Sequence, residues 1–148
     1  MTTKNTSPIA PASTEPIDWF LQHLVDLVNQ TRETTFGVTI TVGGQVISGV
    51  MIGGAEYFHL FADDMAQGCL LGGMSQDEAD SIKESLASNA KTYEPSENDP
   101  GNPIYIHLKN ARHFYGNGSI PSNSGMLWRG KLESVDGFSL GALSSVAS

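Results

Sequence analysis

Two blocks of this sequence alternate apolar with small or polar residues, and this period of two restricts the chain to folds that contain a sheet. In the first block, residues 38–42 alternate valine and isoleucine with threonine. The pair Gly43-Gly44 follows and suits the positive φ angles of a tight hairpin turn. Residues 45–52 then form a second run rich in valine and isoleucine. The first block therefore predicts a β-hairpin.

The second block lies in the last third of the chain and shows the same alternation. Residues 104–109 and 126–132 each alternate apolar with polar side chains, and residues 138–140 begin a last short strand. We expect Asp136-Gly137 to form a two-residue turn before that strand. Together the two blocks predict five strands.

Elsewhere the apolar residues recur at intervals of three and four, which is the spacing of an amphipathic helix. One such helix is expected to begin near Asp18, because an acidic residue suits the first turn. Between the two strand blocks we expect a short helix at residues 56–65, a flexible joint at 68–73 and a second helix beginning at Ser75. A glutamate three residues after that serine has the spacing of a capping box.

These elements predict one α+β domain over residues 17–143. Gly49, in the middle of the second strand, suits a bend or bulge. We therefore expect a small, strongly curved five-stranded barrel of the SH3 or Sm type, with an N-terminal helix and an inserted helical segment. An open α+β sheet with helices on one face is the alternative. Residues 1–16 are expected to form a disordered tail and residues 144–148 to fray.

The charge of the chain is large and unevenly placed. A formal net charge of −8 argues against a nonspecific nucleic-acid binder, because phosphate contacts need a basic surface. Residues 53–99 contain ten acidic and two basic residues, whereas residues 101–148 contain four basic and two acidic ones. Such opposite patches are compatible with head-to-tail self-association. A solvated acidic helical segment beside an ordinary sheet explains the same asymmetry, so the pattern alone leaves both interpretations open.

Residues suited to catalysis do not form a recognisable pattern. Cys69 lies among apolar neighbours, and the adjacent Asp63 and Asp64 point in different directions on a helix. The four histidines lack the spacing of a metal site, and His107, which shares a strand face with Lys109, is expected to face solvent. No glycine-rich phosphate loop occurs in the sequence. We therefore expect a protein that is not an enzyme and that needs no metal or cofactor.

Basic residues in the last third of the chain are the candidate interaction residues. Arg129 and Lys131 alternate on one face of a predicted strand, while Trp128 faces the other way. They form either a basic patch for an acidic partner or an ordinary solvent-facing strand surface. Lys109 and Arg112 belong to the same basic region and complete the set of candidates.

Three stretches resemble signatures of the gas vesicle accessory protein GvpU family, in the same order and at similar separations. The first is Gly-Gly-Gln-Val-Ile-Ser-Gly-Val-Met-Ile at residues 43–52, and the second is Ile-His-Leu-Lys-Asn at 106–110. The third joins Trp-Arg-Gly-Lys at 128–131 to Val-Asp-Gly-Phe at 135–138. With the strand before the first stretch, the resemblance extends over residues 36–143.

The resemblance implies a cytoplasmic, non-enzymatic protein associated with gas vesicles, the gas-filled protein shells that make cells buoyant. The implied partners are shell proteins or other gas vesicle accessory proteins, with neither nucleic acid nor a membrane among them. The implied role is to promote or regulate vesicle clustering as a homo-oligomer. An Sm-like nucleic-acid-binding module, which rests on fold analogy alone, is the alternative.

The residues that match the family's motifs are expected to be structural. We expect Gly49 and Gly137 to shape the backbone and Trp128 to pack in the core, which leaves Arg129 and Lys131 as the better candidates for contact. The full set of motif residues is Gly49, Trp128, Gly130, Asp136, Gly137 and Phe138.

Overall fold

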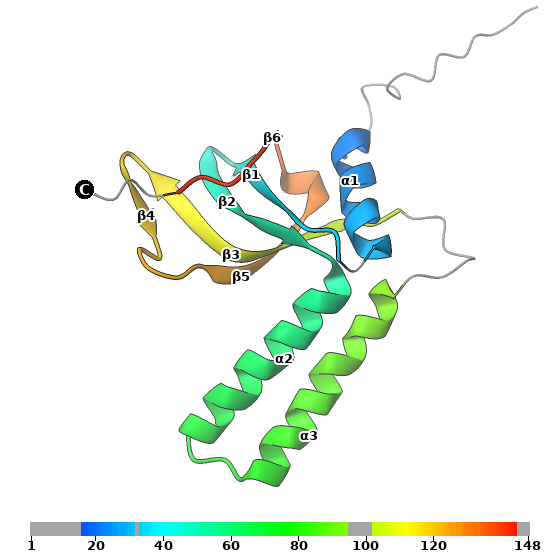
Figure 1. Ribbon diagram of the computed structural model, residues 1–148, viewed down its shortest axis with the longest axis vertical. Coiled ribbons are helices and arrows are strands. Elements are labelled where there is room, and N and C mark those ends of the chain that lie inside the picture. The colour runs from blue at the N-terminus through cyan, green and yellow to red at the C-terminus, as the bar shows by residue number, and fades with distance from the viewer. Residues whose placement is uncertain (1–15, 32, 95–101, 145–148) are drawn as a thin grey trace, which may run out of the picture.

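A computed structural model describes residues 16–31, 33–94 and 102–144. It has three α-helices and a six-stranded antiparallel sheet (Figure 1). The elements in chain order are α1 (Trp19–Gln30), β1 (Phe36–Val42), β2 (Gln45–Ile52), α2 (Gly54–Leu71), α3 (Gln76–Ala87), the 3-10 helix η1 (Ser88–Tyr93), β3 (Tyr105–Tyr115), β4 (Gly118–Ile120), β5 (Met126–Lys131), the 3-10 helix η2 (Leu132–Ser134) and β6 (Gly137–Leu140).

The sheet is open, so the predicted SH3-like or Sm-like barrel is wrong. Its strand order is β4-β3-β2-β1-β6, and β5 pairs with β3 beside β4. The edge strands at the two sides do not pair with each other, and β4 adds a sixth strand to the five that the sequence predicts. The mixed α+β class is confirmed, and of the two predicted architectures the structure has the open sheet.

Helix α1 covers one face of the sheet and forms the core with it. The carboxylate of Asp18 caps the helix by accepting a hydrogen bond of 2.8 Å from the Phe20 backbone N–H, so the helix begins where the sequence predicts. Side chains from alternate positions of β1, β2 and β3 meet the helix. The buried cluster comprises Leu21, Val25, Val28, Val38, Ile40, Ile47, Met51, Ile106, Leu108, Ala111 and Leu132.

A glycine-centred bulge bends the middle of the sheet, as the sequence predicts. The pairing of β2 with β3 shifts register between Ser48 and Val50, and Gly49 lies at the shift. A Cβ atom on Gly49 would lie 3.0 Å from both the Lys109 carbonyl oxygen and the Ala111 Cα, which is tighter than a side chain accepts without movement. Only glycine therefore lets the two strands approach this closely.

The segment between β5 and β6 crosses from one edge of the sheet to the other, and this corrects the predicted turn at Asp136-Gly137. The side chain of Leu132, directly after β5, is buried in the core. The chain therefore leaves β5 at this residue, and β6 pairs with β1 rather than with β5. The Asp136 N–H donates to the Thr41 carbonyl oxygen over 2.8 Å, and the Asp136 carboxylate accepts from the Gly43 N–H over 2.9 Å. Asp136 therefore fixes the β1–β2 turn rather than forming a turn of its own.

Helices α2 and α3 form an antiparallel hairpin that projects away from the sheet (Figure 1). Helix α2 runs from Gly54 to Leu71, which is longer than the predicted helix at 56–65, because Gly68 is accommodated within the helix. The predicted capping box at the start of α3 is confirmed, since Ser75 and Glu78 exchange hydrogen bonds.

The end of the described chain lies across the face of the sheet opposite α1. The Thr39 hydroxyl donates to the Gly141 carbonyl oxygen over 2.8 Å, and the Leu143 N–H donates to the Ser48 hydroxyl oxygen over 2.6 Å. The predicted tail at 1–16 and frayed end at 144–148 fall almost wholly outside the described residues, so both stay predictions.

Candidate functional site

Aromatic side chains from the hairpin meet a histidine and an arginine of the sheet where the two parts of the fold join. The aromatic residues come from the first turns of α2, the end of η1 and the start of β3, and they lie on the sheet face opposite α1. We call this group the junction cluster. Its members are Tyr57, Phe58, Tyr93, Tyr105, His107 and Arg129.

His107 is the buried centre of the junction cluster, and the prediction that it faces solvent is wrong. Its exposed fraction is 1%, and its ring centroid lies 4.7 Å from that of Tyr57 and 5.2 Å from that of Tyr93. Burial lowers the pKa of His107 to about 3, and the nearby charge of Arg129 lowers it further in the same direction. The imidazole is therefore neutral near pH 7.

Arg129 is held between aromatic rings. Its guanidinium carbon lies 3.8 Å from the Tyr105 ring centroid and 5.4 Å from that of Phe58, and its Nη1 lies 3.4 Å from the His107 Nε2. Among the described residues no carboxylate forms an ion pair with it. Cation–π contact with the two rings therefore stabilises the Arg129 guanidinium. Burial raises the pKa of the Tyr57 hydroxyl above its usual value of 10, and the nearby charge of Arg129 lowers it by a smaller amount.

Gly54 gives the Tyr93 ring its place in the junction cluster. A Cβ atom at Gly54 would overlap the Tyr93 ring, and the Gly54 N–H donates to the Asn29 Oδ1 over 2.9 Å. The first residue of α2 is thereby fixed to α1 on one side and to η1 on the other. No signal in the sequence singles out this glycine.

The Gly54→Ala variant is expected to unfold with a free energy about 1–3 kcal/mol lower than that of the native chain, because the Tyr93 ring must move. Gly68→Ala in the same helix is the matched control, since a Cβ at Gly68 meets no atom within 4 Å. That control is expected to gain about 0.5–1 kcal/mol from the better helix propensity of alanine. Urea titration followed by circular dichroism measures both, and equal effects would contradict the tight fit at Gly54.

The four basic candidates lie on one face of the neighbouring strands β3 and β5, but their side chains differ in their partners and in their exposure. Lys109 pairs with Glu56 of α2 at 2.8 Å, and Arg112 Nη2 donates to the Asn123 carbonyl oxygen over 2.6 Å. Arg129 is stacked in the junction cluster. Lys131 is the exposed member of the set. The structure therefore brings the four residues together but leaves Lys131 as the most accessible charge.

The motif residues near the end of the chain lie in or beside the core. Trp128 is partly buried against the core cluster and lies across Gly130, where a Cβ atom would overlap its ring. Phe138 also packs partly against the core, and its ring centroid lies 5.9 Å from that of Phe20. Gly137 is the first residue of β6 and pairs with Thr41.

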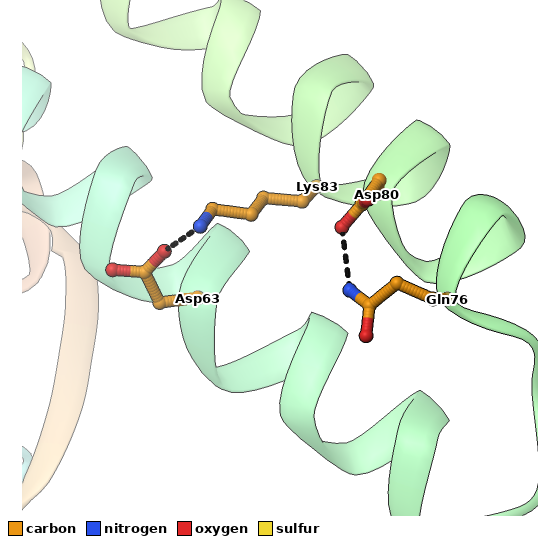
Figure 2. A network of polar contacts seen from close by, with 4 residues as sticks. All are labelled: Asp63, Gln76, Asp80 and Lys83. Carbon is orange, nitrogen blue, oxygen red and sulfur yellow. Dashed lines mark hydrogen bonds and ion pairs between the residues drawn. The ribbon is translucent and has the colours of Figure 1, made fainter.

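The hairpin carries much of the acidic middle of the chain as a solvated surface. Lys83 of α3 pairs with Asp63 of α2 at 3.0 Å, and the Gln76 amide donates to the Asp80 carboxylate over 2.8 Å (Figure 2). Both side chains of the ion pair are about half exposed, so its contribution to stability is at most about 1 kcal/mol. Asp64 lies beside a groove of about 560 Å³ between α2 and β5.

The described ranges contain neither a cluster of metal-ligating side chains nor a membrane-spanning helix. No group of three or more His, Cys, Asp or Glu side chains is placed there to hold a metal ion. In the same ranges, no helix is both long and apolar enough to span a membrane. Cys69 is half-buried on the hairpin and forms no disulfide.

Sequence reasoning missed the aromatic half of the junction cluster. The sequence indicates Tyr57 and Phe58 as apolar positions of a helix, with no indication of what they cover. Tyr93 lies far from Tyr57 and Phe58 in sequence and belongs to no motif. The available signal was the group of aromatic residues in the first turns of α2, directly after the apolar strand at residues 45–52.

Comparison with known proteins identifies the family. The model of the family described as gas vesicle protein GvpU-like matches residues 18–143, which extend from the cap of α1 to the segment that crosses β1 and β2. No curated protein and no solved structure was found to match the chain significantly. The matched region contains every helix and strand of the described fold, so the chain belongs to the GvpU-like family of gas vesicle proteins.

Proposed function

We propose that this gas vesicle-associated protein is a non-enzymatic accessory factor that binds shell proteins or other accessory proteins and regulates how vesicles cluster. The observation that carries the proposal is the family match over residues 18–143, which includes every described element. The family is an accessory family and is not known as enzymatic. We propose that the protein acts in the cytoplasm, at the vesicle surface and without a cofactor.

The shape of the fold supports a bridging role. A factor that joins two large particles needs at least two contact surfaces, because one weak site cannot hold both. The acidic hairpin projects from the sheet, and the basic strands β3 and β5 lie beside its base (Figure 1). We propose Lys131 as the leading contact residue on the basic side, with Arg129, Lys109 and Arg112 as its neighbours.

The alternative of an Sm-like nucleic-acid-binding module has no support. The sheet is open rather than closed, and the chain carries a net charge of −8. Lys109 and Arg112, which belong to its basic face, are engaged by groups of the chain itself.

Co-flotation with isolated gas vesicles tests the proposal. The native protein is expected to float with the vesicles, and Lys131→Glu to lower the bound fraction about tenfold at low salt, because it reverses the accessible basic charge. Lys91→Glu, at an exposed position of η1, makes the same change of charge on the acidic side and is expected to change binding by less than about twofold.

Failure of the native protein to float at any salt concentration would contradict the proposed function. Equal losses in the two variants would instead contradict the role given to Lys131. Light scattering of the same mixtures measures clustering, which is expected to rise with the bound fraction.

A further inference from the structure

Among the described residues, no strand pairs with the outer edge of β6. Within the described chain β6 pairs with β1 alone. Ser139 lies opposite Thr39, and the Gly141 N–H donates to the Gly37 carbonyl oxygen over 2.8 Å. Since backbone groups of an antiparallel strand alternate in direction, those of Phe138 and Leu140 point away from β1. They form an open edge onto which another strand can pair.

An apolar slot lies directly beside this edge, between α1 and β6. It has a volume of about 210 Å³, and apolar side chains alone line it. Leu140 at its mouth is 77% exposed, and Phe20 on the adjacent side of α1 is 47% exposed. The lining residues are Phe20, Leu24, Phe36, Val38, Phe138 and Leu140.

This edge lacks the charged residues and proline that often prevent strands from joining. Residues 137–143 contain no charged residue and no proline. At the opposite side of the sheet, β5 carries Arg129 and Lys131, and Pro121 directly follows β4. Charged residues and proline on edge strands are the usual protection against pairing between copies. The contrast marks the β6 edge as a surface for pairing.

We infer that β6 is a self-association strand, which pairs antiparallel with β6 of a second copy across a two-fold axis normal to the sheet. Such an axis keeps Phe138 and Leu140 of both copies on the α1 side, so the two apolar slots face each other. Phe138 then lies opposite the second copy's Leu140, and both direct their backbone groups across the interface. The inference rests on the proposed function, for which it supplies the second contact surface.

The charge distribution favours a second copy as the occupant. Two molecules of net charge −8 repel each other, so they associate best where each is least charged. The strand itself carries no charge, and the acidic hairpin points away from it (Figure 1). The strongest repulsion is therefore kept far from the contact and is screened by salt.

The exposed area indicates a dimer of moderate affinity. The large apolar side chains near the edge are 44–77% exposed, and at roughly 200 Å² each they offer about 340 Å² per copy. Backbone and polar atoms of β6 and α1 add to this, against the roughly 800 Å² per partner of a standard interface. We therefore expect a dissociation constant on the order of micromolar. The exposed side chains are Trp19, Phe20 and Leu140.

Sedimentation velocity over a range from about 1 to about 200 micromolar tests the inference. The native protein is expected to shift from monomer to dimer, and Leu140→Lys to weaken dimerisation at least about tenfold, because it places like charges across the axis. Leu71→Lys is the matched control, since Leu71 is 89% exposed at the hairpin tip and gains the same charge. That control is expected to dimerise like the native protein.

A second variant separates backbone pairing from side-chain burial. Leu140→Pro removes the outward N–H at that position and leaves the groups that face β1 in place. It is expected to weaken dimerisation as strongly as the lysine variant, with an unchanged circular dichroism spectrum. In the native protein, amide hydrogen exchange at Phe138 and Leu140 is expected to slow as concentration rises.

Several outcomes would overturn the inference. A native protein that stays monomeric over the whole range, or equal weakening by Leu140→Lys and Leu71→Lys, excludes β6 pairing. Flotation distinguishes this failure from that of the proposed function. A monomer that still floats with vesicles refutes only the β6 inference, whereas a β6 dimer that never floats refutes only the proposed function. Protection of the β6 amides only when vesicles are added would assign the edge to a vesicle protein instead.

Discussion

Leu132→Ala is expected to lower the free energy of unfolding by about 2–5 kcal/mol, the range for truncating a buried leucine. Leu132 is 1% exposed and belongs to the core cluster, and its N–H donates to the Ile104 carbonyl oxygen over 2.9 Å. It is also the residue at which the chain leaves β5 to cross toward β6. Its loss opens a cavity in the core and loosens the crossover. Urea unfolding followed by circular dichroism measures the change.

Two further variants serve as a buried comparison and an exposed control for Leu132→Ala. Ile40→Ala, at a fully buried position of β1, is expected to cost a similar 2–5 kcal/mol. Leu71→Ala, at an 89% exposed position, is expected to cost less than about 0.5 kcal/mol. A loss below about 1 kcal/mol for Leu132→Ala would show that the crossover does not close the core.

Acidification is expected to destabilise the fold through His107. The unfolded chain binds a proton at this histidine below about pH 6.5, whereas the folded chain does so only near its pKa of about 3. Between these values the unfolded state binds more protons, so stability falls as the pH falls. At about 1.4 kcal/mol per pH unit, the loss from pH 6.5 to 4 is about 3 kcal/mol. Above pH 6.5 both states are neutral, and this contribution disappears.

The His107→Gln variant isolates that effect. Carboxylates also titrate in acid, but they do so in both proteins, so the difference between the two stability curves reports on His107. The native protein is expected to lose stability more steeply than the variant between pH 6.5 and 4. Guanidinium unfolding at a series of pH values measures both curves. Parallel curves would show that the histidine takes up its proton without unfolding.

Local sequence signals predicted the local features of the fold. The alternation at residues 38–42, the Gly43-Gly44 turn and the capping box at Ser75 each depend on neighbours within a few residues, and the structure confirms them. The bulge at Gly49 was predicted for the same reason. These features are encoded by backbone preferences that act over short distances.

The errors concern contacts between segments far apart in the chain. Closure into a barrel was expected from the glycine turns and the bend at Gly49, but β5 ends the sheet beside β3 and β6 ends it beside β1, without pairing to each other. His107 was placed on the correct strand face, yet Tyr57 and Tyr93 come from distant segments to cover it. Alternation defines which way a side chain points, and only the tertiary fold decides whether another element lies above it.

The interaction site was predicted in part. Arg129 and Lys131 do share one strand face, as the alternation indicated, but Arg129 lies between aromatic rings. Aromatic stacking of this kind joins residues of different elements and leaves no periodic trace in the sequence. The contact role of Lys131 stays a prediction until the flotation experiment is made.

The hairpin also sets a distance. Strand β2 is joined to α2 by the single residue Gly53, so the hairpin is anchored directly to a central strand. The 18 residues of α2 give a length of about 27 Å at 1.5 Å per residue. If the tip of the hairpin contacts a particle, the length of α2 sets the distance between that particle and the sheet.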